Sequence, residues 1–404
     1  MAKLNDYIPI IGQPVIDELK LLADKLRGKV IQIINSTSVG GGVAEILNRM
    51  VPLLKGLGIN TRWDVIKGGE QFFEVTKKFH NVLHGGKELV ENRDFEIFYE
   101  TSQKNIEEMS IYGDIIFVHD PQPIALVQKK TQNQWIWRCH IDVSNPHEKV
   151  WAFIKKFISQ YDASVFSAPS FAQKLLIRQY LIPPSIDPLS DKNKPLAPSV
   201  ISAVLKKYGI ARDKPIVTQI SRFDYLKDPL GVIEAYRLVK KYNDCRLVLA
   251  GGTARDDPES GEVLAKVKEK AGSDPDIHVL LIPPGSDLEI NALQRASDVI
   301  VQKSIKEGFG LTVAEALWKA KPVVASGVGG IPLQVKHKYS GQICYSIEGA
   351  ALGIKLFLNS PDYARRLGEH GRDHIKQNFL LTRHLRDYML LFLSLYHPED
   401  IVSL

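Results

Sequence analysis

Short runs of β-branched residues alternate with amphipathic stretches along this chain, and the alternation runs twice. Strands separated by helical stretches in this way form parallel sheets with crossover helices, which favours an α/β fold. The expected strands are 30–35, 61–66, 114–120, 135–142 and 164–169, then 216–222, 246–252, 277–282, 298–302 and 322–328. Expected helices include 43–57, 229–242, 261–271, 287–296, 311–320, 348–358, 361–378 and 382–396. The pattern predicts two Rossmann-like doubly wound domains.

A proline-rich segment separates the two runs of the pattern. Residues 183–200 hold five prolines and no apolar periodicity, which is typical of a linker. The length of 404 residues also fits two or three domains. Two doubly wound domains joined in this way predict a ligand cleft between them, at the carboxyl ends of the strands.

Composition excludes several classes of protein. Lys+Arg 52 against Asp+Glu 46 leave a net charge of +6, without the clustered basic and aromatic patch that nucleic-acid binding requires. The three cysteines lack CxxC spacing, which argues against a disulfide framework and a cysteine-rich zinc site. The sequence shows neither an 18-residue apolar run nor a signal-peptide core, so we expect no membrane segment and a cytoplasmic location.

The strongest chemical motif is EGFGLTVAE, residues 307–315, which follows an expected strand and opens an expected helix. Gly308 and Gly310 remove side chains where a ligand approaches the backbone, and the helix start favours a diphosphate. Glu307 and Glu315 flank this turn and can accept hydrogen bonds from sugar hydroxyls. In the plainer alternative, Glu307 interacts with the helix start and Glu315 is solvated. Glycoside hydrolysis is disfavoured, because its two carboxylates lie on opposite sides of one bond.

A second motif, SRFDYLKDP (221–229), lies in another loop between a strand and a helix. Arg222 offers a forked donor and Lys227 a point charge, the two ways in which proteins neutralise phosphates. An ordinary basic surface loop is the alternative.

A third motif is the glycine-rich turn STSVGGGVAE, residues 36–45. It lacks the GxGxxG spacing, and no acidic residue ends the second expected strand, which disfavours a nicotinamide site. Gly41 and Gly42 can approach a sugar or phosphate, or simply form a tight turn.

Polar residues also end two strands of the first half, His119 and Asp120 in one segment, His140 in the other. Such positions suit ligand contacts, although a buried histidine bonded to backbone is the commoner case. The 11 histidines do not cluster and no HExxH occurs, so we expect no metal site.

Taken together, these segments resemble the retaining glycosyltransferases of the GT-B fold, family 4, and within them the trehalose glycosyltransferring synthases. The segments that carry the resemblance are STSVGGGVAEIL (36–47), VHDPQPIAL (118–126), WRCHIDVSNP (137–146), PPSIDPLS (183–190), DDPE (256–259) and SIKEGFGLTVAEALWKAKPVV (304–324). The resemblance implies an acceptor-side domain over 1–190, a nucleotide-sugar domain over 191–378, and a C-terminal helix, 379–404, that crosses back to the first. The two domains would face each other across the cleft.

The resemblance also implies the reaction and the residues that perform it. The enzyme would make α,α-trehalose from a nucleotide-diphosphoglucose, such as UDP- or ADP-glucose, and free glucose, releasing the nucleoside diphosphate. Arg222 and Lys227 would bind the diphosphate, Glu307 the donor glucose and Glu315 the ribose, with His140 beside the transferred glucose and Asp120 facing the acceptor. The remaining donor-binding residues would be Gly41, Gly42, Gly308, Phe309, Gly310, Leu311 and Thr312.

Two alternatives stay open. A trehalose phosphorylase would share most of these motifs and use glucose 1-phosphate. A catalytically silent nucleotide-sugar sensor is disfavoured by the intact Arg222, Lys227 and Glu307. The resemblance implies no obligatory cofactor, because in this family Arg and Lys take the role that Mg²⁺ would have, although Mg²⁺ is compatible with the motifs. We expect no nucleic-acid or membrane partner, and a homodimer is compatible with the sequence.

Overall fold

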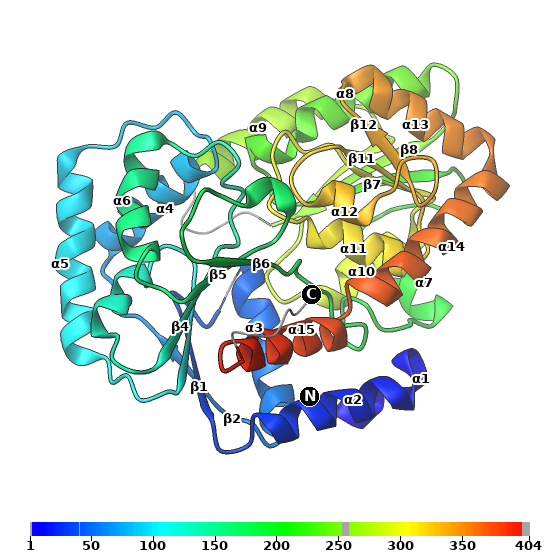
Figure 1. Cartoon of the computed structure of the whole chain (residues 1–404). Coiled ribbons are helices and arrows are strands. Elements are labelled where there is room, and N and C mark those ends of the chain that lie inside the picture. The colour runs from blue at the N-terminus through cyan, green and yellow to red at the C-terminus, as the bar shows by residue number, and fades with distance from the viewer. Residues whose placement is uncertain (1, 40, 253–257, 398–404) are drawn as a thin grey trace. The chain divides into compact units, whose positions relative to one another are not determined.

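The computed structural model describes residues 2–39, 41–252 and 258–397, and the chain divides into two compact units (Figure 1). The first unit comprises Met1–Pro184 and Leu381–Leu404, and the second comprises Ser185–Leu380. The sequence predicts boundaries at 190/191 and 378/379. Gly40 of the glycine-rich turn and Asp256 and Asp257 of the DDPE segment lie outside the described residues.

The first unit is built on a parallel six-stranded sheet with the order β2-β1-β3-β4-β5-β6. Its strands are β1 Val30–Asn35, β2 Asn60–Val65, β3 Ile115–His119, β4 Gln134–Arg138, β5 Ala163–Phe166 and β6 Arg178–Leu181. Its helices are α1 Ile8–Ile11, α2 Gln13–Lys25, α3 Gly41–Gly56, α4 Glu70–Leu83, α5 Asn92–Glu108, α6 Glu148–Ile158 and α15 Leu381–Ser394, with short 3₁₀ helices η1 Leu4–Tyr7, η2 Ile124–Lys129 and η3 Pro169–Phe171.

Helices cover both faces of this sheet, which is why its central strands are largely apolar and buried. On one side α4, α5 and α6 pack through aromatic rings, with Phe79 of α4 5.8 Å from Phe98 of α5 and 6.1 Å from Phe153 of α6. On the other side lie α2, α3 and α15 (Figure 1). Tyr388 of α15 meets Phe117 of β3 edge to face at 4.9 Å. The last helix is therefore part of the core of the first unit.

The second unit also has a parallel six-stranded sheet, ordered β12-β11-β10-β7-β8-β9. Its strands are β7 Ile216–Ile220, β8 Arg246–Gly251, β9 Ile277–Leu281, β10 Val299–Gln302, β11 Val323–Ser326 and β12 Gln342–Cys344. Its helices are α7 Pro198–Lys207, α8 Pro229–Lys240, α9 Pro258–Ala271, α10 Asp287–Ala296, α11 Leu311–Trp318, α12 Ile331–Gln334, α13 Ile347–Asn359 and α14 Pro361–Asn378, with the 3₁₀ helix η4 Tyr225–Lys227.

Alternation along β8 divides the apolar core of this unit between the two faces of the sheet. Leu247 and Leu249 pack with residues of α8, α9 and α13 on one face, whereas Val248 and Ala250 pack with residues of α7 and α10 on the other. The period of two is that of a strand buried on both sides. The two predicted doubly wound domains are confirmed.

The structure differs from the sequence-based expectation at several places. β6 was not predicted, because RQYL is a short and largely exposed edge strand without an apolar run. β4 ends at Arg138, so His140 lies in a loop rather than in the strand predicted to reach residue 142. The proline-rich segment packs onto the second unit instead of remaining free. Asn291 of α10 donates hydrogen bonds to the carbonyls of Asp191 and Lys194, both at 2.8 Å.

Within the described ranges, no helix is long and apolar enough to cross a membrane.

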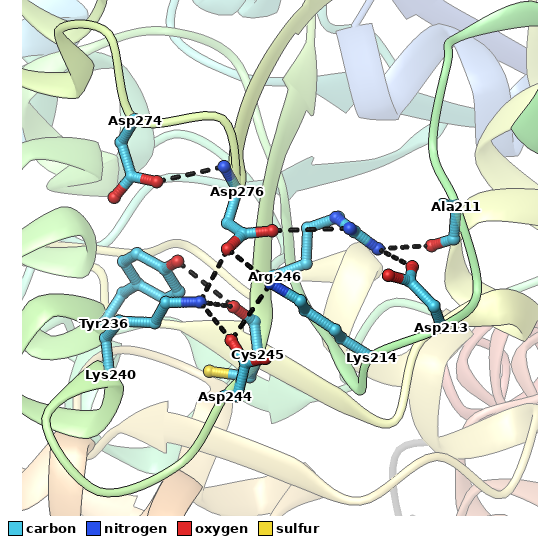
Figure 2. A network of polar contacts seen from close by, with 10 residues as sticks. All are labelled: Ala211, Asp213, Lys214, Tyr236, Lys240, Asp244, Cys245, Arg246, Asp274 and Asp276. Atoms are coloured by element: carbon cyan, nitrogen blue, oxygen red, sulfur yellow. Dashed lines mark hydrogen bonds and ion pairs between the residues drawn. The ribbon is translucent and has the colours of Figure 1, made fainter.

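A charged network closes the amino-terminal ends of β8 and β9 (Figure 2). Asp276, just before β9, accepts hydrogen bonds from Lys240 at 2.6 Å and Lys214 at 2.9 Å, and pairs with Arg246 at 3.3 Å. The hydrogen bonds from Lys240 and Lys214 lower the pKa of Asp276 to about 2. One mostly buried carboxylate thus neutralises cations from three parts of the chain.

We predict that Asp276→Asn lowers the free energy of unfolding of the second unit by about 2 kcal/mol at neutral pH, since hydrogen bonds to a charged group are lost. Because the pKa of the folded Asp276 lies below its usual 3.8, its contribution is full above that pH and disappears as pH falls towards 2. Urea unfolding of the wild type and of Asp276→Asn, repeated at decreasing pH, measures the difference between their free energies of unfolding. This difference should become smaller towards pH 2.

Asp244→Asn is the matched control, because Asp244 joins the same network from a side chain that is 66% exposed rather than 11%. Its effect should stay below about 1 kcal/mol. Equal losses for the two variants would contradict the central role of Asp276.

Candidate active site

In the second unit, the strand order reverses between β7 and β10, which are hydrogen-bonded neighbours. Ligands of doubly wound sheets bind outside the carboxyl ends of the strands at such a point. The loops that leave these two strands, 221–228 and 303–310, carry Arg222, Lys227 and Glu307. The topology therefore brings the two strongest sequence motifs together.

Lys227 and Glu307 form an ion pair between these loops. Lys227 Nζ donates to Glu307 Oε2 at 2.7 Å, and the two side chains are only 16% and 10% exposed. Ser304 Oγ donates to the same oxygen at 3.2 Å. Glu307 Oε1 has no hydrogen-bond partner among the described residues. The carboxylate is thus held through one oxygen and keeps the other available.

Further contacts that the sequence analysis did not anticipate fix the two loops. Ile305 N donates to the Leu226 carbonyl at 2.8 Å, and Lys303 pairs with Asp228. Asp228 has a left-handed backbone, φ 47°, and caps α8 by accepting from Gly231 N at 3.0 Å. Leu226, Lys227 and Asp228 thus each contact a residue of the facing loop, and these contacts join the two loops.

Arg222 does not join the ion pair directly. Its side chain is 58% exposed, and its Nη2 lies 3.2 Å from Asp224 Oδ2. Asp224 Oδ1 in turn accepts from the backbone N of Lys227 at 3.1 Å. Asp224 therefore links the Arg222 side chain to the backbone of Lys227, and the Arg222 side chain stays more than half exposed.

The glycine turn after Glu307 adopts a conformation that only small residues tolerate. Gly310 has φ 83° and precedes α11, so the helix begins at Leu311. A Cβ on Gly329, at φ 56°, would lie 1.7 Å from the Glu307 carbonyl oxygen. Gly330 N donates to the Gly308 carbonyl at 2.9 Å. The turn after β11 thus packs directly against the backbone of Glu307 and Gly308.

Two predicted donor-binding side chains have structural partners. The Phe309 ring is buried and lies 5.5 Å from the Phe379 ring, so it belongs to the core. Thr312 Oγ1 donates to Gln302 Oε1 at 3.4 Å. A ligand would therefore meet the backbone of these residues rather than their side chains.

Glu315 is buried within α11 rather than solvated. Lys319, one turn further on, donates to the Glu315 carbonyl at 3.0 Å and to Asn193 Oδ1 at 2.9 Å. Burial lowers the pKa of Lys319 to about 7, and the negative charge of Glu315 opposes that shift. A buried carboxylate beside a buried amine is an arrangement that the plain helix pattern does not reveal.

The first unit gathers polar residues at the carboxyl ends of β3 and β4. His119 and His140 share a hydrogen bond of 3.0 Å between Nδ1 and Nε2, with their rings stacked 5.3 Å apart. Asp120 Oδ1 accepts from the backbone N of His140 at 2.9 Å. Gly41, at φ 74°, and Gly42 begin α3 after β1. The structure thus brings Asp120 and His140 together.

A buried arginine that the sequence analysis did not assign to the site lies beside this group. Arg138 pairs with His119 in the sheet register, and its Nη2 donates to Ser167 Oγ at 3.1 Å. Its Nε and Nη1 make no hydrogen bond within the part of the chain that the structure describes. Burial and this guanidinium lower the pKa of His119 to about 3. Burial raises the pKa of Asp120 to about 6, although the His140 N–H and the Arg138 charge act in the opposite direction.

Over residues 2–39, 41–252 and 258–397, no group of three or more His, Cys, Asp or Glu side chains lies close enough to hold a metal ion.

Comparisons with known proteins agree with this architecture. Residues 33–173 match the family described as trehalose synthase, N-terminal domain, and residues 201–374 match glycosyl transferases group 1. A trehalose synthase from Thermococcus litoralis is 43% identical over 399 residues, covering 97% of each chain. A trehalose phosphorylase from Pleurotus pulmonarius is 27% identical over 438 residues, covering 92% of this chain and 58% of that protein.

The fold is also found among solved structures. A UDP-forming α,α-trehalose-phosphate synthase from Burkholderia vietnamiensis aligns with a TM-score of 0.71 at 15% identity, covering 91% of this chain and 98% of that one. At this identity the likeness concerns the fold alone. The predicted GT-B fold class is confirmed.

We predict that Gly329→Ala lowers both stability and turnover, because the new Cβ must displace the Glu307 carbonyl. The matched control is Gly209→Ala, at φ 66° with nothing within 4 Å of its Cβ. The control should lose only the cost of a left-handed alanine, about 1–2 kcal/mol, and keep wild-type turnover. Thermal unfolding and initial rates of both variants measure the difference. Unchanged turnover in Gly329→Ala would show that Glu307 does not need this support.

Proposed function

The chain belongs to the trehalose synthase family of glycosyltransferases, and we propose that it makes α,α-trehalose by retaining transfer of glucose from a nucleotide-diphosphoglucose to free glucose. The observation that carries this proposal is the geometry of Glu307. Its Oε2 is held by Lys227 and Ser304, while its Oε1 stays available to accept from a sugar hydroxyl.

Lys227 and Arg222 have the chemistry to bind the diphosphate. An ammonium donates three hydrogen bonds, so Lys227 can keep its bond to Glu307 and still donate to a phosphate oxygen. The exposed guanidinium of Arg222 can offer a second, forked contact. Both cations would offset the negative charge that develops on the departing nucleoside diphosphate.

The remaining donor contacts follow from the family resemblance. Backbone N–H groups of Gly308 to Thr312 at the start of α11 would support the sugar and phosphate. Glu315 would accept from the ribose hydroxyls. This assignment needs the buried carboxylate to become accessible from the ligand side, and a nucleotide complex would test it directly.

Residues of the first unit are proposed to act on the sugars. His140 would contact the transferred glucose and Asp120 the acceptor, with Gly41 and Gly42 approaching the donor. In the transfer, the bond between the anomeric carbon and the diphosphate oxygen breaks with its electron pair on the diphosphate. A bond forms between that carbon and the acceptor hydroxyl oxygen on the same face, and the hydroxyl proton passes to the leaving diphosphate.

A nucleotide donor is favoured over glucose 1-phosphate by the number of donors available. Arg222, Lys227 and the α11 amides are more than one phosphate requires, and Glu315 would have no ribose to bind in glucose 1-phosphate. The greater identity to the synthase than to the phosphorylase supports the same choice. The proposal further includes no obligatory cofactor, a cytoplasmic location and compatibility with a homodimer.

The first test supplies the protein with glucose and, in separate reactions, UDP-glucose, ADP-glucose or glucose 1-phosphate. We expect α,α-trehalose and a free nucleoside diphosphate from at least one nucleotide sugar, and almost none from glucose 1-phosphate. Trehalose formed only from glucose 1-phosphate would establish the phosphorylase instead. Nucleotide-sugar binding without any transfer would establish the sensor.

The second test separates the two glutamates. Glu307→Gln should lower kcat, because it removes about 2–4 kcal/mol of transition-state stabilisation, whereas Glu315→Gln should mainly raise KM for the nucleotide sugar. Lys214→Ala is the control, because it removes another lysine of the second unit that is paired with a carboxylate, at the opposite ends of the strands. It should cost stability and leave both constants unchanged. Identical effects of the two glutamate variants on both constants would contradict the assignment.

A further inference from the structure

A chain of buried polar side chains leads from the end of β10 to Glu307. Gln302, the last residue of β10, donates through Nε2 to Ser304 Oγ at 3.0 Å, and Ser304 Oγ donates to Glu307 Oε2 at 3.2 Å. All three residues are buried. Thr312 Oγ1 approaches Gln302 Oε1 at 3.4 Å, a weaker contact from the first turn of α11.

The direction of each hydrogen bond in this chain is determined by its ends. A hydroxyl has one proton to donate, and an ionised carboxylate only accepts. Ser304 must therefore direct its proton towards Glu307, and its oxygen is then left to accept from the Gln302 amide. The opposite orientation of the Gln302 amide would place two acceptors around one hydroxyl proton. A hydroxyl that donates to the amide oxygen would leave the carboxylate with one donor fewer, which is unfavourable for a buried charged group.

The geometry points to Ser304, supported by Gln302, as a positioning residue that holds Glu307 Oε2 so that Oε1 faces the donor sugar. This inference rests on the proposed role of Glu307 and adds the means by which the carboxylate is oriented. Lys227 alone holds the carboxylate loosely, because its ammonium ends a long side chain that can follow Oε2 when the carboxylate turns about the Cγ–Cδ bond. A second donor on the same oxygen, from a different direction, removes that freedom.

Loss of the Ser304 hydroxyl should affect only the binding of the glucose part of the nucleotide sugar. Without the Ser304 hydroxyl, Glu307 should accept less well from a glucose hydroxyl, whereas contacts to the diphosphate and the base stay the same. The relevant quantity is the ratio of the dissociation constants for the nucleoside diphosphate and the nucleotide sugar. A general loosening of the loop would weaken both ligands and leave this ratio unchanged.

The experiment compares Ser304→Ala, Gln302→Met and the double variant with the wild type. The probes are UDP with UDP-glucose and ADP with ADP-glucose, with binding followed by calorimetry and transfer to glucose by initial rates. For Ser304→Ala we expect kcat to fall on the order of tenfold, with weaker binding of the nucleotide sugar and unchanged binding of the nucleoside diphosphate. Gln302→Met should have a smaller effect in the same direction and add almost nothing in the Ser304→Ala background, because it acts through that hydroxyl.

Two further variants make the test robust. Ser297→Ala removes an equally buried serine hydroxyl just before β10, bonded to Thr218 Oγ1 at 2.6 Å and to the Leu293 carbonyl at 2.7 Å. It should lower the melting temperature and leave kcat and both affinities unchanged. Ser304→Thr retains the hydroxyl and should retain most of the activity. If Ser304→Ala does not fold, Gln302→Met carries the same comparison.

The outcomes separate this inference from the function on which it rests. A wild type that binds neither nucleotide sugar and transfers no glucose would overturn the proposed function, and the role of Ser304 with it. A wild type that transfers glucose, with a Ser304→Ala variant of unchanged kcat and unchanged affinity ratio, would overturn this inference alone. Additive losses in the double variant would also overturn it.

Discussion

The ion pair between Lys227 and Glu307 is the interaction on which the candidate donor site depends. Burying two charges costs free energy unless each keeps its hydrogen bonds. Here both side chains are mostly buried, and Lys227 Nζ lies 2.7 Å from Glu307 Oε2. Glutamines on the two central strands of the second unit hold the residues of this pair in place. Gln219 of β7 donates to the Lys227 carbonyl at 2.7 Å, and Gln302 of β10 reaches Glu307 through Ser304. Two buried glutamines thus fix the two sides of one charged pair.

The two ends of the same sheet serve different purposes. At the amino-terminal ends, Asp276 accepts from Lys214 and Lys240, and every charge in that network has a partner within the chain. At the carboxyl ends, Arg222 remains largely in solvent and Glu307 keeps one oxygen without a partner among the described residues. A satisfied network stabilises the fold, whereas available donors and acceptors on a rigid surface are what a polar ligand requires.

The fold was predictable because β-branched runs and helical periods are local signals, and ten of the strands carry them. β6 and the three-residue β12 lack such runs, since their pairing depends on neighbours far away in the sequence. The motifs likewise identified Lys227 and Glu307. The local sequence around each residue does not indicate that the two form an ion pair, because they lie 80 positions apart. Gln219 and Gln302 did leave a signal, as polar residues at the next-to-last and last positions of mostly apolar strands. The burial of Arg138 and Glu315 depends on tertiary packing, and sequence patterns do not encode it.

Left-handed non-glycine residues lie beside both sets of candidate residues, and also at Ala320 and Lys338 elsewhere in the second unit. Asp120, at φ 65°, follows β3 in the first unit, and Asp228, at φ 47°, follows the Lys227 turn in the second. A left-handed non-glycine residue costs free energy and persists only where its surroundings hold it. Asp120 is held by a hydrogen bond from its N–H to the Arg138 carbonyl at 2.8 Å and by the His140 N–H on its carboxylate. Asp228 is held by Lys303 and by the Gly231 N–H. In each unit an aspartate side chain thus stabilises the turn that presents its neighbour, His140 in one and Lys227 in the other. At these two turns the strained backbone is therefore held by contacts within the candidate regions themselves.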